Sequence, residues 1–567
     1  MNITDHFAFT KKTSVLIVGG GPIGLAMAAE LGWRGISVTM VEQQDEKTGP
    51  AKMLLVGVRT MEFCRHLGIA PAVRDWGFPP DFCMDNIFVA GSLNGFEIAR
   101  VPMAPMGGPV DSVFSPERQR HCPQTWFDPI LRDKAASYPH VQLRYQTRFE
   151  SLIQDEDGVT TIVRDHATGE QEAIRSDYVV AADGNNSKVR QQLGIEMRGF
   201  PYLDTSINIE IDIPDLNSLH KMGNAGRYAM IGPEGMWATF VAIDGRRTWR
   251  LTLYGANDID VDALDIDAAI QRLVGRPFDY KIISSGKWVR RMVVADAFCD
   301  DRVFLAGDAC HTHPPNGGFG MNTGIGDVFD LGWKLEATLS GWGGPQLLAS
   351  YDKERRPACH RAANESLANY RRLTAETRFP GIEEVTEEGR KLRRKLGQHL
   401  EQENIKAYQP IGIHLGYTYD PSPINVSDGT PRPAADLVGY VPNARAGSRA
   451  PHFWVSPAVS VLDLFGPGYT LLRFGRIDAS GLIAAARMKN VPITVHDIVS
   501  PDARALYGCE LCLVRPDGHV AWRGDAIPVD CMRLIDRMRG AGSAAAALTA
   551  DALELAAHAS AVVSPRF

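Results

Sequence analysis

The 567-residue chain has few cysteines, no excess of basic charge and no uninterrupted apolar run of membrane length. Its nine cysteines lack the spacing of a disulfide framework, which excludes disulfide-rich secreted classes and favours reduced thiols in a cytosol. Lysine and arginine total 60 against 67 aspartate and glutamate, a net charge of −7, so the basic footprint of a nucleic-acid-binding protein is missing. We expect a cytoplasmic protein with no nucleic-acid or membrane partner.

One apolar stretch, residues 15–33, approaches the length of a membrane span or a signal segment. Five glycines and Glu30 interrupt it, and the basic residues and cleavage site of a signal peptide do not stand in the usual order. We therefore assign the stretch to a globular fold. A chain of this length holds about three to four domain-sized units, with enough mass for a large buried core.

Residues 14–42 have the pattern of a βαβ unit. A β-branched strand at 14–18 runs into the turn Gly19-x-Gly21-x-x-Gly24, a helix follows, and a second strand ends at Glu42. The first glycine makes a tight turn, the second lets the backbone approach a pyrophosphate and the third packs helix on strand. The carboxylate of Glu42 is suited to accept hydrogen bonds from ribose hydroxyls. The segment predicts a dinucleotide site, and this motif alone fits NAD and FAD equally.

The rest of the chain indicates an α/β fold class with three parts. Residues 1–400 predict a discontinuous Rossmann-like domain, with an inserted antiparallel sheet at about 80–110 and 200–290 and a helical segment at 324–400. Residues 401–450 are rich in proline and polar residues, as linkers are. A compact α/β module follows over 451–567.

Two further motifs each follow a predicted strand. The first is Asp183-Gly184 with Ser187-x-Val189-Arg190, and the second is Gly307-Asp308 with a glycine-rich segment that extends to Gly324. With the βαβ motif and in this order, they resemble the single-component FAD-dependent aromatic hydroxylases, the group of para-hydroxybenzoate, phenol and hydroxybiphenyl hydroxylases. The resemblance covers about the first 400 residues.

This resemblance implies FAD bound non-covalently, NAD(P)H as a transient co-substrate and O₂. Asp308 would bind the ribityl chain, and the amides of Gly320, Met321 and Asn322 at a helix start would face the negative edge of the reduced flavin. Arg59 and Gln124 match cofactor-touching positions; a surface charge and a helix cap are their plain alternatives. The full cofactor set is Gly19, Gly21, Gly24, Glu42, Arg59, Gln124, Asp183, Gly307, Asp308, Pro315, Gly320, Met321 and Asn322.

The resemblance fails at the phenol base. The family's Asp or His, about five residues before the arginine of Arg59-Thr-Met-Glu, is replaced here by Met53 or Leu54, which cannot accept a proton. His121, three residues before Gln124, is the substitute that we expect to act as the catalytic base. A solvated loop histidine is the alternative.

The cysteine clusters do not predict a metal. Cys310-His311-Thr312-His313 has no second ligand cluster at suitable spacing. In the segments Arg449-Ala-Pro-His, Leu462-Asp-Leu-Phe-Gly and Arg515-Pro-Asp-Gly-His, the C-terminal module resembles the thioredoxin-like domain of phenol-hydroxylase-type enzymes, without the redox cysteine pair. Cys509 and Cys512 fall in one predicted strand, on opposite faces. The module is expected to be structural or to serve a homodimer.

The implied function is that of an NAD(P)H-dependent FAD monooxygenase, which hydroxylates a phenolic or other electron-rich aromatic substrate through a flavin C4a-hydroperoxide. Baeyer–Villiger oxidation, epoxidation or oxidative decarboxylation of an aromatic or polyketide-like substrate is the alternative on the same fold. Substrate identity, regiochemistry and the choice between NADH and NADPH stay open. Residues expected to line the substrate are Tyr228, Trp237, Arg250 and Thr252, and a one-residue slip would reverse their faces.

Overall fold

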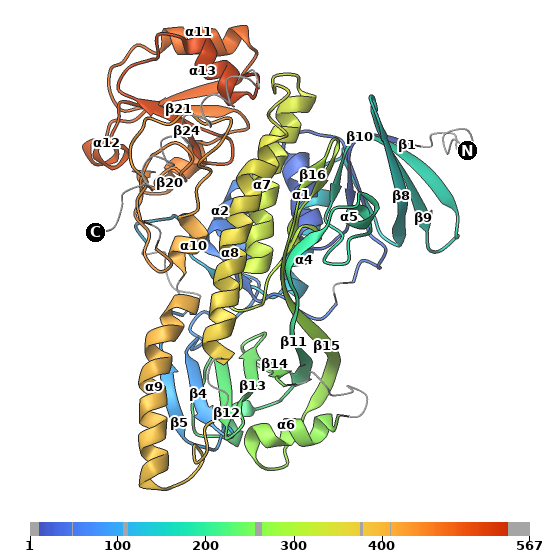
Figure 1. Cartoon of the computed structure of the whole chain (residues 1–567), viewed down its shortest axis with the longest axis vertical. Coiled ribbons are helices and arrows are strands. Elements are labelled where there is room, and N and C mark those ends of the chain that lie inside the picture. The colour runs from blue at the N-terminus through green and yellow to red at the C-terminus, as the bar shows by residue number, and fades with distance from the viewer. Residues whose placement is uncertain are drawn as a thin grey trace, which may run out of the picture. The chain divides into compact units, whose positions relative to one another are not determined.

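The computed structural model describes residues 11–47, 49–105, 112–255, 264–374, 378–408, 410–434 and 436–542 (Figure 1). The chain divides into two compact units. The first comprises residues 1–328, 359–415 and 435–440, and the second comprises 329–358, 416–434 and 441–567. Within the described ranges, none of the helices combines the length and apolar character needed to cross a bilayer.

The first unit contains the predicted dinucleotide-binding sheet. Strands β10, β1, β2 and β7 run parallel, and β17 joins β10 in parallel at the other edge. Residues 15–18 of β1 are almost fully buried, as expected for a central parallel strand. The strands are β1 (Lys11–Val18), β2 (Val38–Val41), β7 (Val141–Arg144), β10 (Gln171–Ala181), β16 (Cys299–Asp300) and β17 (Val303–Leu305), with the hairpin β8 (Thr147–Asp155) and β9 (Gly158–Asp165) beside β10.

Helix α1 (Pro22–Trp33) connects β1 to β2, which completes the predicted βαβ unit. Four further helices of the first unit follow along the chain up to residue 192. They are α2 (Val58–His66), α3 (Ala70–Arg74), α4 (Gln124–Ala136) and α5 (Lys188–Gln192), with the small strand pair β3 (Leu55–Val56) and β6 (Arg120–His121).

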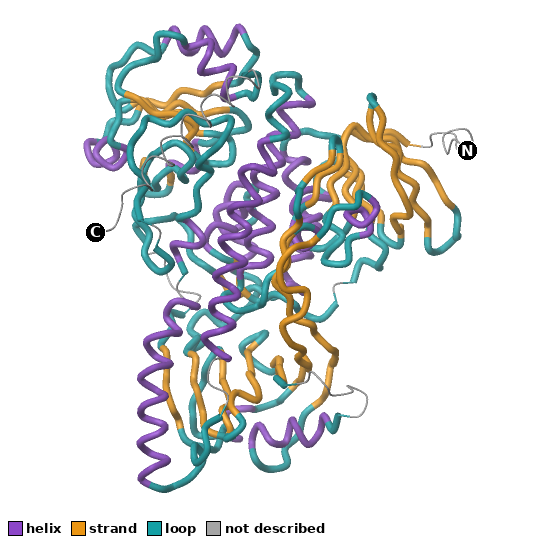
Figure 2. Tube along the Cα trace, viewed as in Figure 1, coloured by secondary structure: helices purple, strands orange, loops and turns teal. Residues whose placement is uncertain are grey.

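A second sheet of the first unit has the order β18-β15-β11-β14-β13-β12-β4-β5. Its pairs are antiparallel, as predicted, except that β12 and β4 are parallel. Figure 2 shows its strands below the parallel sheet. They are β4 (Asn86–Ala90), β5 (Glu97–Val101), β11 (Met197–Asp212), β12 (Arg227–Gly232), β13 (Gly235–Ala242), β14 (Thr248–Leu253), β15 (Lys281–Ala295) and β18 (His311–Thr312).

One face of this sheet packs against α6 (Ile266–Val274) around an apolar core that includes Phe240, Trp249 and Leu251. Rings Phe240 and Trp249 stack at 4.9 Å between centroids. The edge at β4 and β5 packs against α9 (Glu387–Tyr408) through a second apolar cluster. Residues 106–111 and 256–263 of the predicted insertion lie outside the described residues.

The predicted helical segment 324–400 contains three helices, α7 (Phe319–Leu339), α8 (Ser350–Thr374) and α9. The predicted linker differs from the structure. Helix α9 extends to Tyr408 because no proline interrupts residues 381–408, and α10 (Ile411–Leu415) follows. Residues 416–434 then belong to the second unit, and 435–440 to the first.

The second unit has a four-stranded sheet of order β22-β21-β23-β24, in which β21 and β22 are parallel. Residues 543–567, at the end of the predicted module, lie outside the described residues. The elements are β19 (Trp454–Ser456), β20 (Val459–Ser460), β21 (Tyr469–Arg473), α11 (Ser480–Met488), β22 (Ile493–Asp497), α12 (Pro501–Tyr507), β23 (Leu511–Val514), β24 (Val520–Gly524) and α13 (Cys531–Met538).

The predicted placement of the two cysteines on opposite strand faces is wrong. Cys509 precedes β23 and follows Gly508, which has φ +62°, so strand alternation does not separate it from Cys512. Both side chains lie in one apolar cluster as free thiols. A hydrogen bond with the Cys512 thiol lowers the pKa of Cys509.

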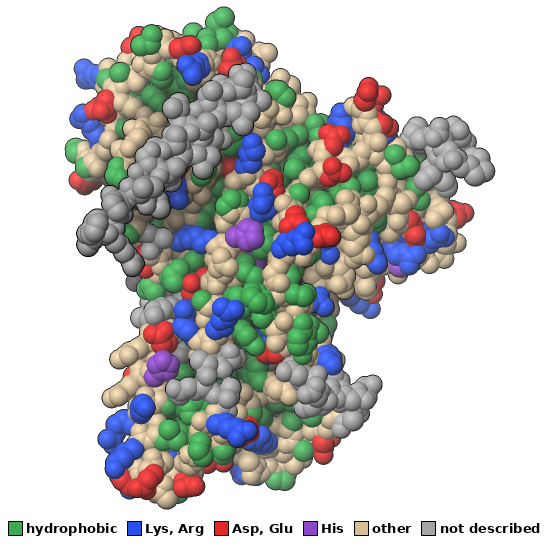
Figure 3. Space-filling view, viewed as in Figure 1, with side chains coloured by type: hydrophobic (Ala, Val, Ile, Leu, Met, Phe, Trp, Pro, Cys, Tyr) green, Lys and Arg blue, Asp and Glu red, His purple; other side chains and the backbone are tan. Residues whose placement is uncertain are grey.

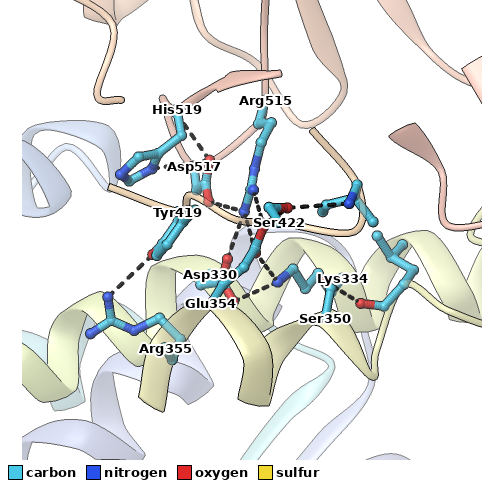
Figure 4. Close-up of polar contacts among 12 residues, drawn as sticks. Asp330, Lys334, Ser350, Glu354, Arg355, Tyr419, Ser422, Arg515, Asp517 and His519 are labelled. Atoms are coloured by element: carbon cyan, nitrogen blue, oxygen red, sulfur yellow. Dashed lines mark hydrogen bonds and ion pairs between the residues drawn. The ribbon is translucent and has the colours of Figure 1, made fainter. Parts of the chain in front are cut away.

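A buried charge network lies inside the second unit (Figure 4). Arg515 donates to Asp330 Oδ1 at 2.7 Å, to Glu354 Oε1 at 2.7 Å and to Asp517 Oδ2 at 2.7 Å. Lys334 Nζ donates to Asp330 at 2.7 Å and to Glu354 at 2.6 Å. Because each charge has oppositely charged partners, burial of the group is tolerated.

Candidate functional site

The turn after β1 has the predicted glycine geometry. Gly19 has φ +110°, and a Cβ there would lie 2.3 Å from the Ala182 carbonyl oxygen. A Cβ on Gly24 would lie 1.9 Å from the Gly19 oxygen, whereas a Cβ on Gly21 would have no atom within 4 Å. Gly19 and Gly24 are therefore needed for packing, and Gly21 leaves open space at the start of α1.

Glu42 is fixed at the end of β2. Its carboxylate accepts hydrogen bonds from the Gly20 amide at 2.6 Å and from the Gln44 amide at 2.8 Å. The acid predicted to bind ribose hydroxyls therefore lies against the glycine turn.

The second and third motifs interlock. Arg190 Nη1 donates to the Ala309 carbonyl at 2.8 Å. Asp183 Oδ2 accepts from the Lys188 and Val189 amides at the start of α5, whereas its buried Oδ1 has no partner among the described residues. Asp183 therefore binds two amides at the start of α5, where Ser187 is the N-cap residue, and its second oxygen can still accept a hydrogen bond from a ligand.

The Gly307-Asp308 motif ends a buried strand. Within residues 303–310 only Asp308 is exposed. Pro315 is also exposed, and a Cβ on Gly320 in the first turn of α7 would have no atom within 4 Å. These positions leave a carboxylate and a helix start accessible to a ligand.

Asn322 has a second role that the sequence did not indicate. Its Oδ1 accepts from the Gly57 amide at 2.7 Å and from Thr60 Oγ1 at 2.7 Å, and its Nδ2 donates to the carbonyls of Leu55 and Gly318. This side chain ties the start of α7 to the segment around β3.

The segment 51–60 contacts both the start of α7, through Asn322, and the second sheet, through Arg250. Arg250 Nη1 donates to the Ala51 carbonyl at 3.0 Å, and the Gln124 amide donates to the Met53 carbonyl at 2.9 Å. Gln124 begins α4, and its side chain donates to Asp128 Oδ2 at 3.0 Å. Gln124 is therefore not the helix cap of its plain alternative, because Pro123 is the N-cap residue and the Gln124 side chain binds another side chain.

Arg59 is not a surface charge. It is 6% exposed in α2, and its Nη1 donates to Glu62 Oε2 at 2.8 Å. Glu62 also accepts from Ser115 at 2.6 Å. The guanidinium is held inside the first unit beside the same segment 51–60.

His121 lies in an aromatic cluster rather than in a solvated loop. Its Nε2 donates to the Ile243 carbonyl at 2.9 Å, and its ring centroid is 4.5 Å from that of Phe78. Burial lowers the pKa of His121 to about 4. The imidazole is therefore neutral at pH 7, and only Nδ1 is left to accept a proton.

The four residues predicted to line the substrate lie on two faces of the second sheet. Tyr228 and Trp237 are in the apolar core, and the Trp237 indole donates to the Gly91 carbonyl at 3.0 Å. Arg250 and Thr252 alternate with core residues along β14 and face away from that core. The prediction of one common lining is wrong because strand alternation puts Tyr228 on the core face, and the register shift opposite Met230 and Ile231 makes Trp237 an extra residue of β13 that also packs in the core.

The polar face carries its own contacts. Thr252 Oγ1 donates to Asn208 Oδ1 at 2.7 Å, and Arg250 is opposite Glu210 in the neighbouring strand. Burial raises the pKa of Glu210, and Arg250 opposes this change. This face therefore holds hydrogen-bonding groups and a cation beside segment 51–60.

Cys310, His311 and Asp327 bring possible metal-ligand atoms within 4.8 Å of one another. Protein partners already engage these groups. His311 Nε2 donates to Asp327 at 2.7 Å, and the Cys310 thiol donates to the carbonyls of Leu305 and Gly307. We therefore assign this cluster to the support of the turn.

A hollow of about 1050 Å³ in the second unit is lined by residues around Arg473, Arg504 and Cys509. None of the predicted site residues lines it.

On the face of the molecule in Figure 3, acidic and basic side chains are intermingled.

The residues of the first unit fit FAD. Gly21 and Gly320 border open space that a ligand can fill and that a Cβ at either position would reduce. Asp183 has an unused buried acceptor, and Asp308 is exposed between buried neighbours. Glu42 lies at the strand end where a ribose binds in this type of fold. The fold and the three interlocked motifs define a flavoprotein.

The FAD binding domain family matches residues 12–366, and the C-terminal domain of aromatic-ring hydroxylases matches residues 443–545. The chain belongs to the FAD-dependent aromatic-ring hydroxylase family. Its cofactor is FAD, its activity is that of a monooxygenase, and NAD(P)H is the co-substrate typical of this family.

Relatives align over nearly the whole chain. The 2,4-dichlorophenol 6-monooxygenase of Delftia acidovorans is 30% identical over 570 residues, covering 90% of this chain and 95% of the relative. The tetracenomycin B2 monooxygenase-dioxygenase of Streptomyces olivaceus is 31% identical over 556 residues, covering 92% and 97%. The rebeccamycin biosynthetic enzyme RebC, solved with reduced flavin, has a TM-score of 0.87 at 37% identity, covering 94% of this chain and 100% of RebC.

Proposed function

We propose that the chain hydroxylates a phenolic or polyketide-like ring whose hydroxyl or acidic group binds at the polar face of the second sheet, beside Arg250. The supporting observation is the position of Arg250, which faces away from the apolar core and donates to Ala51 in the segment that also contacts Gln124. An arginine at this place can bind a phenolate or carboxylate.

Similar proteins support this range of substrates. Their names include a dichlorophenol monooxygenase and a putative polyketide hydroxylase of Streptomyces halstedii, which is 32% identical over 560 residues. RebC was solved with bound 7-carboxy-K252c, and aklavinone-11 hydroxylase with FAD and aklavinone. The first two names share an oxygenase or hydroxylase activity.

In this proposal the residues of the chain bind the cofactor and orient the substrate ring. Asp308, Glu42 and the helix starts of α1 and α7 would hold FAD, which would supply oxygen activation after reduction by NAD(P)H. The amides at the start of α7 would stabilise negative charge on the bound cofactor. Arg250 and Thr252 orient the ring.

The environment of His121 favours a second candidate. With a pKa of about 4 and with Nε2 bound to Ile243, His121 is a weak acceptor for the proton of a phenol. An oxygenation that needs no phenol base, namely Baeyer–Villiger oxidation, epoxidation or oxidative decarboxylation, agrees better with this environment.

The test is an aerobic screen of phenols and polyketide phenols with NADH or NADPH. We expect substrate-dependent NAD(P)H loss and a product heavier by one oxygen atom that derives from ¹⁸O₂. Arg250→Gln should raise KM for acidic substrates more than for neutral ones. Arg247→Gln is the matched control, because this arginine on the same hairpin pairs with Asp212 at the surface. Equal effects of the two variants would refute the role of Arg250.

We also propose that the protein acts as a cytoplasmic homodimer. The composition and the presence of a C-terminal module without an assigned reaction support this assembly. Light scattering on the purified full chain tests it, and a monomer at micromolar concentration would contradict it.

A further inference from the structure

A buried carboxylate–imidazole pair lies directly behind the Gly307-Asp308 turn. Asp327 Oδ2 accepts from His311 Nε2 at 2.7 Å and from the Gly307 amide at 3.0 Å. Asp327 and His311 have no exposed surface. Two donors therefore converge on one carboxylate oxygen, and one of them is the backbone of the cofactor motif.

Gly307 is confined by helices α1 and α7. It has φ +62°, and a Cβ there would lie 2.8 Å from Ile23 Cγ1 of helix α1. A Cβ on Gly324 of helix α7 would lie 3.1 Å from the Gly307 Cα. The Arg190 guanidinium holds the Ala309 carbonyl two residues further on. The exposed Asp308 therefore extends from a turn whose neighbours fix its backbone.

We propose that Asp327 is a positioning residue for FAD. By accepting from both the Gly307 amide and His311, it sets the direction in which Asp308 faces the cofactor, and so it controls FAD affinity without touching FAD. This inference rests on FAD binding at Asp308 and does not depend on the identity of the substrate.

The charges of the pair agree with this role. Burial alone would lower the pKa of His311, but the Cys359 thiol and the Asp327 carboxylate outweigh burial and raise that pKa well above its usual value. A protonated His311 donates a charge-assisted hydrogen bond to Asp327, and such bonds are shorter and stronger than neutral ones. Its other oxygen accepts from the Cys359 thiol at 3.7 Å.

The chain offers a matched pair as a control. Glu30 in helix α1 accepts from His66 Nε2 at 3.0 Å, and its other oxygen accepts from Arg34 at 2.7 Å. Glu30 is also fully buried in the first unit. It resembles Asp327 in its imidazole partner but holds no amide of the three cofactor motifs in the contacts given by the structure.

The experiment compares Asp327→Asn and Asp327→Ala with Glu30→Gln and Glu30→Ala in the full chain. FAD is removed, and FAD is then titrated into each apoprotein while flavin fluorescence is followed. The melting temperature of each apoprotein is measured alongside, so that a loss of stability is separated from a loss of affinity.

We expect Asp327→Ala to raise the Kd for FAD about tenfold or more, the size of one lost charge-assisted hydrogen bond. Asp327→Asn should fall between this variant and the wild type, because its amide oxygen can still accept from Gly307. Both Glu30 variants should keep the Kd within about twofold of the wild-type value, even where the melting temperature falls.

Equal Kd values for Asp327→Asn and Glu30→Gln would overturn the proposal, as would a wild-type Kd in Asp327→Ala. If an alanine variant does not fold, the Asn and Gln variants decide the question by themselves. A wild-type chain that binds no FAD would instead contradict the cofactor assignment, and the substrate proposal is tested separately by turnover.

Discussion

Helix α7 carries two buried carboxylates three residues apart, and their partners differ. In the first unit, Asp327 holds the Gly307 amide and His311 behind a turn whose next residue is exposed. In the second unit, Asp330 accepts from Lys334 and Arg515 in a network with no exposed charged member among Asp330, Lys334, Glu354, Arg515 and Asp517. Similar chemistry therefore supports ligand binding in one place and stability in the other.

The largest expected effect removes the centre of the second network. Arg515→Ala would leave three buried carboxyl groups without their shared guanidinium, which should lower the free energy of unfolding by about 3–5 kcal/mol. Urea denaturation measures this loss. Arg473→Ala, which breaks a partly exposed pair with Asp497, should cost less than about 1 kcal/mol. A similar cost for both variants would remove the contrast between the networks.

The second prediction concerns the exposed end of the first network. Asp308→Ala should weaken FAD binding by about 1.5–3 kcal/mol, because one hydrogen bond to a charged group is lost. The stability of the apoprotein should hardly change, since Asp308 is exposed. Fluorescence titration and urea denaturation of the same apoprotein check the two parts. Wild-type FAD affinity in this variant would refute the assignment of Asp308.

The third prediction uses pH. The pKa of His121 is lowered to about 4 in the folded chain, so between pH 6.5 and 4 the unfolded chain binds a proton that the folded chain does not. Stability is therefore lost as pH falls through this window, by about 2 kcal/mol between pH 7 and 5. His121→Asn should flatten this dependence in urea denaturation. An unchanged slope would show that other groups cause the acid sensitivity.

The smallest effect is expected for the two cysteines of the second unit. The Cys509→Ser/Cys512→Ser double variant should keep FAD affinity and the ratio of product to NADPH, because both thiols lie in an apolar cluster without a predicted site residue. Turnover with and without a dithiol checks this expectation. A dithiol effect that is lost in the double variant would reveal a redox role for the pair.

The sequence predicted those parts of the site that depend on local patterns. Gly19, Gly21 and Gly24 could be assigned because a tight turn, an open approach and close packing each require glycine within six residues. Asn322 and Asp327 were missed as structural supports because their partners lie outside any local pattern: Asn322 binds Gly57, 265 residues away, and Asp327 binds Gly307, 20 residues away. No periodicity encodes such a contact.

The prediction of the sheet faces failed for a different reason. Alternation gives two faces, but the sequence does not say which one meets the apolar core. The register shift opposite Met230 and Ile231 also inserts Trp237 as an extra residue and changes the phase within β13. Tyr228 and Trp237 therefore became core residues, while Arg250 and Thr252 face the other way. The prediction for Cys509 and Cys512 failed because the predicted strand included Cys509, whereas β23 begins at Leu511.

The most direct test of the contrast along α7 is to measure FAD affinity and the free energy of unfolding for Asp327→Ala and Asp330→Ala together. We predict that Asp327→Ala raises the Kd for FAD about tenfold or more, whereas Asp330→Ala lowers the free energy of unfolding and keeps the Kd within about twofold of wild type. An Asp330→Ala variant that weakens FAD binding as much as Asp327→Ala would contradict the account.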